Sequence, residues 1–164
     1  AYFVFPHIAP EEVIRRSFAY YERITTHDSS LSTCIFSIVA SQLGEHDKAA
    51  YYFGDSLRLD LMNLHHNTGD GIHTANMGGC YMAIVNGFAE LRISAEGIAL
   101  NPWLPKGWTG YRFRFHYQGR LLGFEINQEQ STLTLMEGQA LTVDFCGETR
   151  QLTRTGEVIT HSFC

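Results

Sequence analysis

Residues 111–126 read YRFRFHYQGRLLGFEI, and this stretch decides the fold class. From Tyr111 to Tyr117 every second side chain is aromatic and the others are polar or charged, which is the period of a β-strand with one buried face. Gln118-Gly-Arg120 then predicts a hairpin turn into a second strand.

Short apolar runs continue beyond this hairpin at intervals of about ten residues. They predict strands over Ser131–Met136 and Leu141–Phe145, so residues 91–164 are expected to form a small antiparallel β-sandwich-like domain. This domain is rich in aromatic side chains, including Trp103 and Trp108. Aromatic residues at strand spacing are more often core residues than a platform for stacking sugars.

Residues 1–90 have a helical period instead. Pro10 followed by Glu11 and Glu12 is typical of a helix start, because proline fits the first turn and acidic side chains favour the positive end of the helix dipole. Apolar side chains then recur three and four residues apart in four segments, at about 13–24, 31–43, 45–62 and 77–88. The chain is therefore predicted to be an α+β protein with a domain boundary at residue 90.

The composition excludes several classes of function. The 12 Lys and Arg residues are dispersed and the formal net charge is −5, so no nucleic-acid partner is expected. No apolar run reaches the roughly 18 residues of a membrane span, and no signal peptide is visible. The four cysteines lack C-x-x-C spacing, which is typical of free thiols in a reducing cytosol. We therefore expect a cytoplasmic protein without membrane association.

The first candidate site is the polar segment His27-Asp-Ser-Ser-Leu-Ser32, which precedes the second predicted helix. Hydroxyl groups at a helix start, beside free backbone N–H groups and the positive end of the dipole, can form an anion site. Asp28 and the serines are also common capping residues, so the segment alone is more simply explained as an N-cap.

The second candidate site is the loop Asn67-Thr-Gly-Asp-Gly-Ile-His-Thr-Ala-Asn-Met-Gly-Gly79, which leads into the fourth helix. His73 stands at the helix start, where an imidazole can donate a hydrogen bond to phosphate. Gly78 and Gly79 come early in the helix, where glycine is unfavourable, so a ligand or another helix is expected to approach their backbone. By itself, His73 is more simply explained as a structural histidine with satisfied hydrogen bonds.

Other chemistries fit the pattern less well. His65 and His66, taken with His73 and His27, lack the spacing of a metal site, so no metal is expected. Ser30, His73 and Asp70 are the residue types of a catalytic triad, but no G-x-S-x-G turn frames the serine.

Taken in order, these segments resemble glycoside hydrolase family 65, which contains maltose, kojibiose and trehalose phosphorylases. Five segments carry the resemblance: Tyr20–Ser32, Leu43–Ala49, Gly69–Gly79, Gly87–Arg92 and Leu100–Pro105. The resemblance implies that residues 1–90 are the terminal helices of an (α/α)6 catalytic barrel with its phosphate-site loops. Residues 91–164 would be the small β-sandwich-like C-terminal domain that follows the barrel.

The resemblance also implies an inverting phosphorylase, which converts an α-glucosyl disaccharide and phosphate into β-glucose 1-phosphate and a free sugar. Ser29, Ser30 and His73 would then bind phosphate, with the backbone near Gly78 and Gly79 in support. Inorganic phosphate is the co-substrate of this reaction, and no cofactor is expected.

The general-acid glutamate of the family lies upstream of the Tyr20–Ser32 segment, so no catalytic residue is expected within these 164 residues. We therefore expect the chain to be an inactive C-terminal fragment that associates with the remainder of the barrel, in a homo-oligomeric parent. Two alternatives stay open: a family hydrolase that uses water, with Asp70 as its base, and a non-catalytic structural or carbohydrate-binding remnant. The pattern does not distinguish among the disaccharides.

Overall fold

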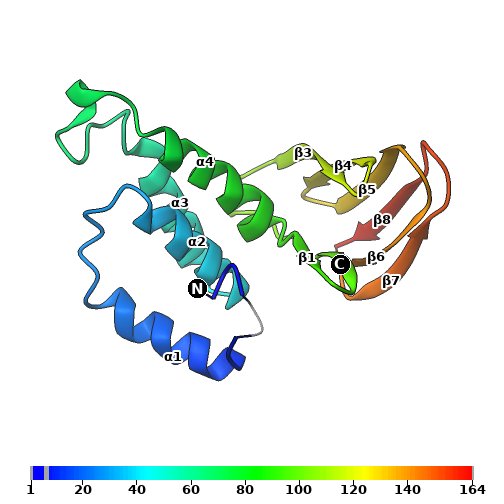
Figure 1. Cartoon of the computed structure of the whole chain (residues 1–164), viewed down its shortest axis with the longest axis horizontal. Helices are drawn as coiled ribbons and strands as arrows, with labels where there is room; N and C mark the ends of the chain where they lie inside the picture. Colours follow the sequence, from blue (N-terminus) through cyan, green and yellow to red (C-terminus); the bar gives the residue numbers. More distant parts are fainter. Residues whose placement is uncertain (1, 6–7, 164) are drawn as a thin grey trace. The chain divides into compact units, whose positions relative to one another are not determined.

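The computed structural model describes residues 2–5 and 8–163. It divides into two compact units, Ala1–Gly87 and Phe88–Cys164. The first unit is helical and the second is built from β-strands, so the expected α+β fold class is confirmed (Figure 1).

The helical unit contains four α-helices, a 3-10 turn and a π-helical segment among the described residues. In chain order these are α1 (Glu11–Glu22), α2 (Ser32–Gln42), α3 (His46–Arg58), η1 (Thr68–Asp70), α4 (Thr74–Met82) and η2 (Ala83–Phe88). The helical period predicted all four helices, and the predicted third helix was longer than α3 is.

Helices α2 and α3 form an antiparallel pair. Gly44 has a φ of 72°, which lets the chain turn sharply between the two helices. The Ser37 hydroxyl in α2 donates a hydrogen bond of 2.8 Å to the Ala49 carbonyl in α3. Glu22 at the end of α1 accepts hydrogen bonds from Lys48 and Tyr52 of α3, at 2.8 and 3.1 Å. These contacts hold α1, α2 and α3 together.

Helix α4 runs parallel to α2. A side chain at Gly79 would meet Cys34 near the start of α2, and the backbone of Gly87 lies against Ile38 and Ser41 further along the same helix. The Ser41 hydroxyl donates to the Gly87 carbonyl at 2.6 Å. Because the early residues of both helices are in contact and so are the later ones, the two N-termini lie at the same end of the helical unit (Figure 1).

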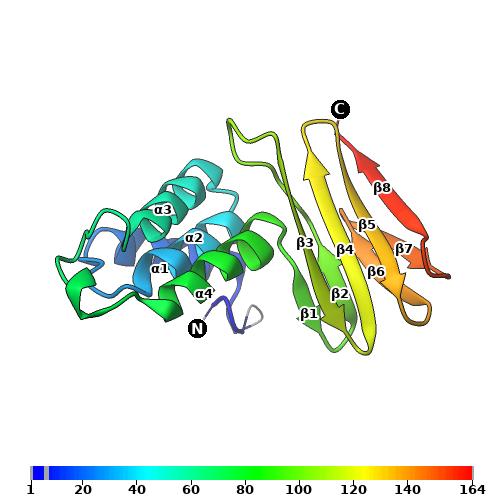
Figure 2. The same cartoon turned by 90° about the horizontal axis from the view of Figure 1, so that it is seen from above.

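The β-unit consists of two four-stranded sheets stacked as a sandwich (Figure 2). One sheet has the order β1-β2-β6-β7, with strands Arg92–Ser94, Gly97–Leu100, Leu141–Phe145 and Glu148–Leu152. The other has the order β3-β4-β5-β8, with strands Gly110–Tyr117, Arg120–Asn127, Gln130–Glu137 and Val158–Ser162.

The predicted hairpin is present as β3 and β4, and β5 continues the antiparallel meander. Phe113 pairs with Phe124, which in turn lies opposite Leu133. Alternate apolar side chains of β4 and β5 are buried, and so are Val143 and Phe145 of β6 in the other sheet. One pairing differs from the antiparallel expectation: β2 and β6 are parallel. Strands β3 to β5 form the crossover that a parallel pair requires.

The aromatic residues at the start of the β-unit form core packing, as expected. Phe88 is fully buried, and its ring centroid lies 4.7 Å from that of Trp103 and 5.7 Å from that of Trp108. The Tyr111 hydroxyl donates to the Trp103 carbonyl at 3.1 Å. These side chains therefore pack against one another instead of presenting an open stacking platform.

None of the helices formed by residues 2–5 and 8–163 combines the length and the apolar content that a membrane span needs.

Candidate functional site

The candidate site lies at the end of the helical unit where α2 and α4 both begin. Ser29 and Ser30 lie directly before Leu31, the N-cap residue of α2, and His73 is the N-cap residue of α4. The first backbone N–H groups of each helix have no partner within the helix, and the helix dipole makes each N-terminus partly positive. Two parallel N-termini at one end therefore favour an anion there.

The segment before α2 differs in detail from the predicted cap. Leu31 is the N-cap residue of α2, and no side chain makes a capping hydrogen bond from that position. The Asp28 carboxylate accepts instead from the Thr26 hydroxyl at 2.6 Å, so a capping role for Asp28 was wrong. The Ser29 hydroxyl accepts a hydrogen bond of 3.3 Å from the Leu31 backbone N–H. Ser29 is exposed and Ser30 is half-buried.

His27 fixes the course of this segment. It adopts a φ of 57°, which is uncommon for a residue other than glycine, and its Nδ1 lies 2.8 Å from the Ser32 hydroxyl. Its ring packs edge-on against Phe36, with centroids 4.7 Å apart. These contacts anchor the chain on both sides of Ser29 and Ser30.

His73 is held by a carboxylate that the sequence analysis did not identify. Its backbone N–H donates to Asp60 Oδ2 at 2.9 Å, and its ring Nδ1 lies 2.5 Å from Asp60 Oδ1. Asp60 follows α3 closely, and its side chain is 7% exposed, against 21% for His73. Both hydrogen bonds go to one carboxylate, so the imidazole is fixed relative to the start of α4.

The other ring nitrogen of His73 faces an amide. Asn67 Nδ2 lies 3.3 Å from His73 Nε2, while Asn67 Oδ1 is buried and has no hydrogen-bond partner in the described part of the chain. The loop that carries Asn67 is itself braced by Asn63, whose Oδ1 accepts from the backbone N–H and the hydroxyl of Thr68, at 3.1 and 2.7 Å. Thus Asp60 and Asn67 contact the imidazole from two sides, and Asn63 holds the loop that carries Asn67.

The contact with His73 keeps Asp60 ionised. The ring hydrogen bond from His73 is the main cause, followed by the backbone N–H of the same residue, and together they hold the pKa of Asp60 below its usual value. The ring centroid of His65 lies 6.4 Å from that of His73.

The lowered pKa of Asp60 predicts a pH-dependent effect of Asp60→Asn on stability. A carboxylate with a folded-state pKa below its unfolded value of about 3.9 stabilises the fold above that pH, and the contribution disappears as pH falls through the folded pKa. The melting temperature of Asp60→Asn should therefore lie below that of the wild type at pH 7, and the two should converge below about pH 4. A difference that stays constant between pH 7 and pH 3 would contradict this assignment.

The two glycines of α4 have different environments. Gly79 is buried, and a Cβ at this position would lie 2.5 Å from Cys34 Sγ, so helix packing explains why glycine is present. Gly78 is exposed, and a Cβ there would meet nothing within 4 Å. Thus the expected close approach of another helix occurs at Gly79. Ligand contacts of the Gly78 and Gly79 backbone stay a prediction, as do those of Ser29, Ser30 and His73.

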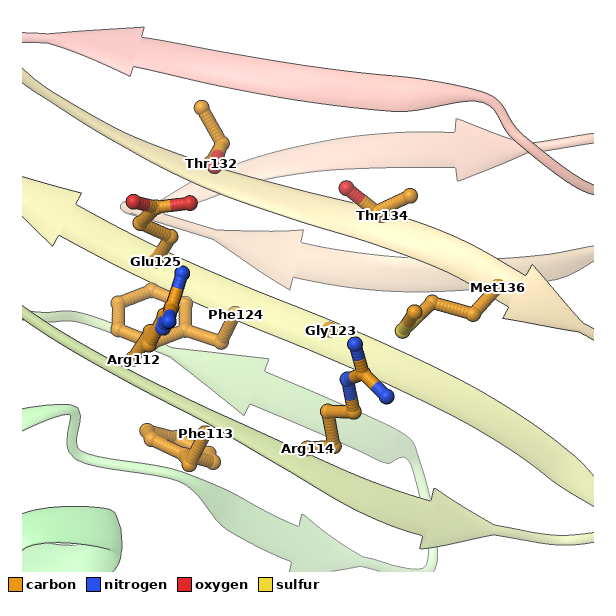
Figure 3. Close-up of a pocket in the computed structure, with 9 residues that line it drawn as sticks. All are labelled: Arg112, Phe113, Arg114, Gly123, Phe124, Glu125, Thr132, Thr134 and Met136. Carbon is orange, nitrogen blue, oxygen red and sulfur yellow. The ribbon is translucent and has the colours of Figure 1, made fainter.

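Among the residues described, no group of three or more His, Cys, Asp or Glu side chains is arranged to hold a metal ion. A hollow of about 470 Å³ does occur elsewhere, on the β3-β4-β5 face of the β-unit (Figure 3). Arg112, Glu125 and Thr132 form one row across these strands, and Arg114, Gly123 and Thr134 form the next. The hollow contains none of the predicted site residues.

Comparison with protein-family models gives two matches to one family. Residues 1–82 match the central catalytic domain of glycosyl hydrolase family 65, and residues 91–152 match the C-terminal domain of the same family. The first match ends at the last residue of α4, and the second begins one residue before β1.

Curated relatives include phosphorylases of trehalose and of maltose. The α,α-trehalose phosphorylase of Geobacillus stearothermophilus is 50% identical over 154 residues, which cover 94% of this chain and 20% of the relative. The maltose phosphorylase of Bacillus subtilis is 38% identical over 127 residues, which cover 77% of this chain and 17% of the relative. The chain therefore spans about a fifth of the length of the curated relatives that it matches.

A solved structure agrees with the sequence comparisons. A protein from the human microbiome, assigned as a kojibiose phosphorylase, superposes with a TM-score of 0.89 and 28% sequence identity. The superposition covers 99% of this chain and 24% of that protein.

Proposed function

Since this chain belongs to glycosyl hydrolase family 65, we propose that it is the C-terminal part of an inverting disaccharide phosphorylase and supplies the phosphate side of the active site. The relatives are phosphorylases of trehalose and maltose, which differ in their sugar but share phosphate as the second substrate. The chain aligns with only about a fifth of each relative, so the sugar-binding residues and the general acid would come from the rest of the protein.

In the proposed reaction, an oxygen of inorganic phosphate attacks the anomeric carbon of an α-glucosyl disaccharide. The bond from that carbon to the leaving sugar breaks on the opposite face, and a glutamic acid outside this chain protonates the leaving oxygen. The products are β-glucose 1-phosphate and a free sugar. Phosphate is already an anionic nucleophile, so it replaces both the water and the general base of an inverting hydrolase.

One observation carries the proposal: His73 is held at the start of α4, parallel to α2, whose own start follows Ser29 and Ser30. An imidazole, two hydroxyl groups and the N–H groups of two helix N-termini are suitable donors for phosphate oxygens. A fixed set of donors can also orient one oxygen toward the anomeric carbon, which lowers the entropic part of the barrier.

The test is phosphate dependence in the full-length protein. Trehalose, maltose and kojibiose are each incubated with the enzyme in the presence and absence of inorganic phosphate, and products are followed by ¹H and ³¹P NMR. We expect β-glucose 1-phosphate to form only with phosphate. Release of free glucose at the same rate without phosphate would support the hydrolase alternative. Sugar binding without any turnover would support the non-catalytic alternative.

Ser30→Ala should weaken phosphate use specifically. Loss of one hydroxyl donor to an anion removes about 1–2 kcal/mol, so KM for phosphate is expected to rise roughly tenfold with little change in melting temperature. Ser94→Ala is the control, because Ser94 Oγ accepts a single backbone N–H, from Glu96, in a turn of the β-unit. An unchanged phosphate KM in Ser30→Ala would remove Ser30 from the site.

A further inference from the structure

We propose that Asp60 is a positioning residue for His73: it fixes the ring orientation and its Nδ1 proton, and thereby directs Nε2 toward phosphate. This inference rests on the proposed function, because it assumes that His73 binds phosphate. It assigns a role to a residue that lies outside both candidate segments of the sequence, 13 positions before the histidine.

The geometry at Asp60 goes beyond an ordinary surface ion pair. One carboxylate accepts both the backbone N–H and the ring N–H of His73, at 2.9 and 2.5 Å. Its side chain is 7% exposed, so water competes little for these bonds. The backbone contact fixes where α4 begins, and the ring contact fixes the rotation of the imidazole about its side-chain bonds. Loss of the carboxylate would therefore release the ring even where the helix persists.

The same contact determines which nitrogen carries the proton. A carboxylate ionised by these hydrogen bonds can only accept, so Nδ1 must be the donor. In the neutral ring Nε2 is then an acceptor, which matches the Asn67 amide group 3.3 Å away. Nε2 can donate to a phosphate oxygen only when the ring gains a second proton, and the negative charge of Asp60 balances the resulting imidazolium.

Asn67 is suited to both protonation states of the ring. Its Nδ2 donates to the neutral Nε2, while its Oδ1 is buried without a hydrogen-bond partner in the described part of the chain. A rotation of the amide by about 180° would present Oδ1 to an Nε2–H group instead. A phosphate oxygen that accepts from Nε2–H would take the place of the Asn67 amide at this nitrogen.

The first experiment determines which ring nitrogen of His73 carries the proton. The full-length protein is labelled with ¹⁵N in histidine only, and the His73 signals are assigned by their loss in His73→Asn. At pH values where the ring is neutral, the wild type should carry its proton on Nδ1. In Asp60→Asn, the new amide group donates to Nδ1 and the proton should move to Nε2. Titration of the wild type with inorganic phosphate should protonate Nε2 and leave Nδ1 protonated.

The second experiment measures KM for phosphate and for the disaccharide. Asp60→Asn should raise KM for phosphate about tenfold, because the neutral Nε2–H group of this variant binds an anion more weakly than the imidazolium that Asp60 stabilises. KM for the disaccharide should stay within about twofold. Asp55→Asn is the matched control, because Asp55 forms an ion pair with Arg58 on the exposed surface of α3, at 2.9 Å.

The outcomes separate the two proposals. If His73→Asn loses phosphate use but Asp60→Asn keeps both the Nδ1 proton and the wild-type phosphate KM, the positioning role of Asp60 is wrong and the proposed function stands. If neither variant changes phosphate use, His73 does not bind phosphate, and both proposals fail. Wild-type protein whose His73 carries its proton on Nε2 without phosphate would also overturn the role of Asp60, whether or not the variants fold.

Discussion

Replacing His73 by asparagine is expected to raise KM for phosphate about 100-fold in the full-length enzyme, with little change in its melting temperature. The amide nitrogen of asparagine lies near the position of Nδ1, so it can still donate to Asp60. It has no group at the position of Nε2, so the donor to phosphate is lost. Removal of a hydrogen bond to a charged group weakens binding by about 1.5–3 kcal/mol, which is consistent with an effect of this size.

This substitution is more informative than alanine. His73→Ala would leave the Asp60 carboxylate with one hydrogen bond fewer at a position that is 7% exposed, and the fold would lose stability along with the site. A fall in activity could then reflect unfolding. With His73→Asn, phosphate affinity and stability respond separately, because only the Nε2 side of the ring is removed.

His66→Asn is the control for this prediction. His66 lies in the same loop, is exposed, and has a φ of 56°, a conformation that asparagine tolerates well. It should leave KM for phosphate within about twofold of the wild type. A similar loss of phosphate use in both variants would indicate a general disturbance of the loop, and unchanged phosphate use in His73→Asn would exclude His73 from the site.

Local periodicity was sufficient to predict the helices and strands β3 to β6, but not strands β1, β2, β7 and β8. Strands β4 to β6 bury apolar residues at alternate positions, and β3 has half-buried aromatic residues at alternate positions. Strand β7 (Glu148–Leu152) buries only Leu152, and in β8 (Val158–Ser162) exposed and half-buried residues alternate. Both lie at sheet edges and gain stability mainly from backbone pairing with β6 and β5. Backbone pairing does not require alternating apolar residues, so the sequence does not indicate these two strands.

The candidate site was predicted in its residue types but not in its contacts. Hydroxyls and a histidine at two helix starts can be recognised locally, because capping and anion binding use adjacent residues. The partner of His73 is 13 residues away, across the loop between α3 and α4, and no fixed spacing relates such a pair. A carboxylate partner could have been expected for a histidine at a phosphate site, but only the packing of α4 beside α3 and α2 identifies it as Asp60.

Gly79→Ala is expected to lower the melting temperature by several degrees, while Gly78→Ala, one residue earlier in α4, should raise it slightly. A methyl group at Gly79 would lie 2.5 Å from Cys34 Sγ and 2.9 Å from Cys34 Cβ, and Cys34 is itself buried. Overpacking of this kind costs about 1–3 kcal/mol, and more where the backbone must move. A methyl group at Gly78 meets nothing within 4 Å, so only the gain in helix propensity of about 0.5–1 kcal/mol is left.

A double mutant identifies what Gly79 is needed for. If the spacing between α2 and α4 requires glycine, Cys34→Ala should restore part of the stability of Gly79→Ala, because the atom 2.5 Å from the new methyl group is removed. The 2.9 Å contact with Cys34 Cβ stays, so the rescue should be incomplete. Full additivity of the two substitutions would show that packing against Cys34 does not explain the glycine.

Gly78→Ala and Gly79→Ala also distinguish helix packing from ligand contact at these two glycines. Gly79→Ala forces α2 and α4 apart close to their N-termini, so it should also raise KM for phosphate, since Ser30 and His73 precede those two helices. Gly78→Ala leaves the spacing of the helices unchanged. A phosphate KM that rises in Gly78→Ala as well would indicate that the ligand approaches the backbone at Gly78. A rise confined to Gly79→Ala would indicate that the glycines act through helix spacing alone.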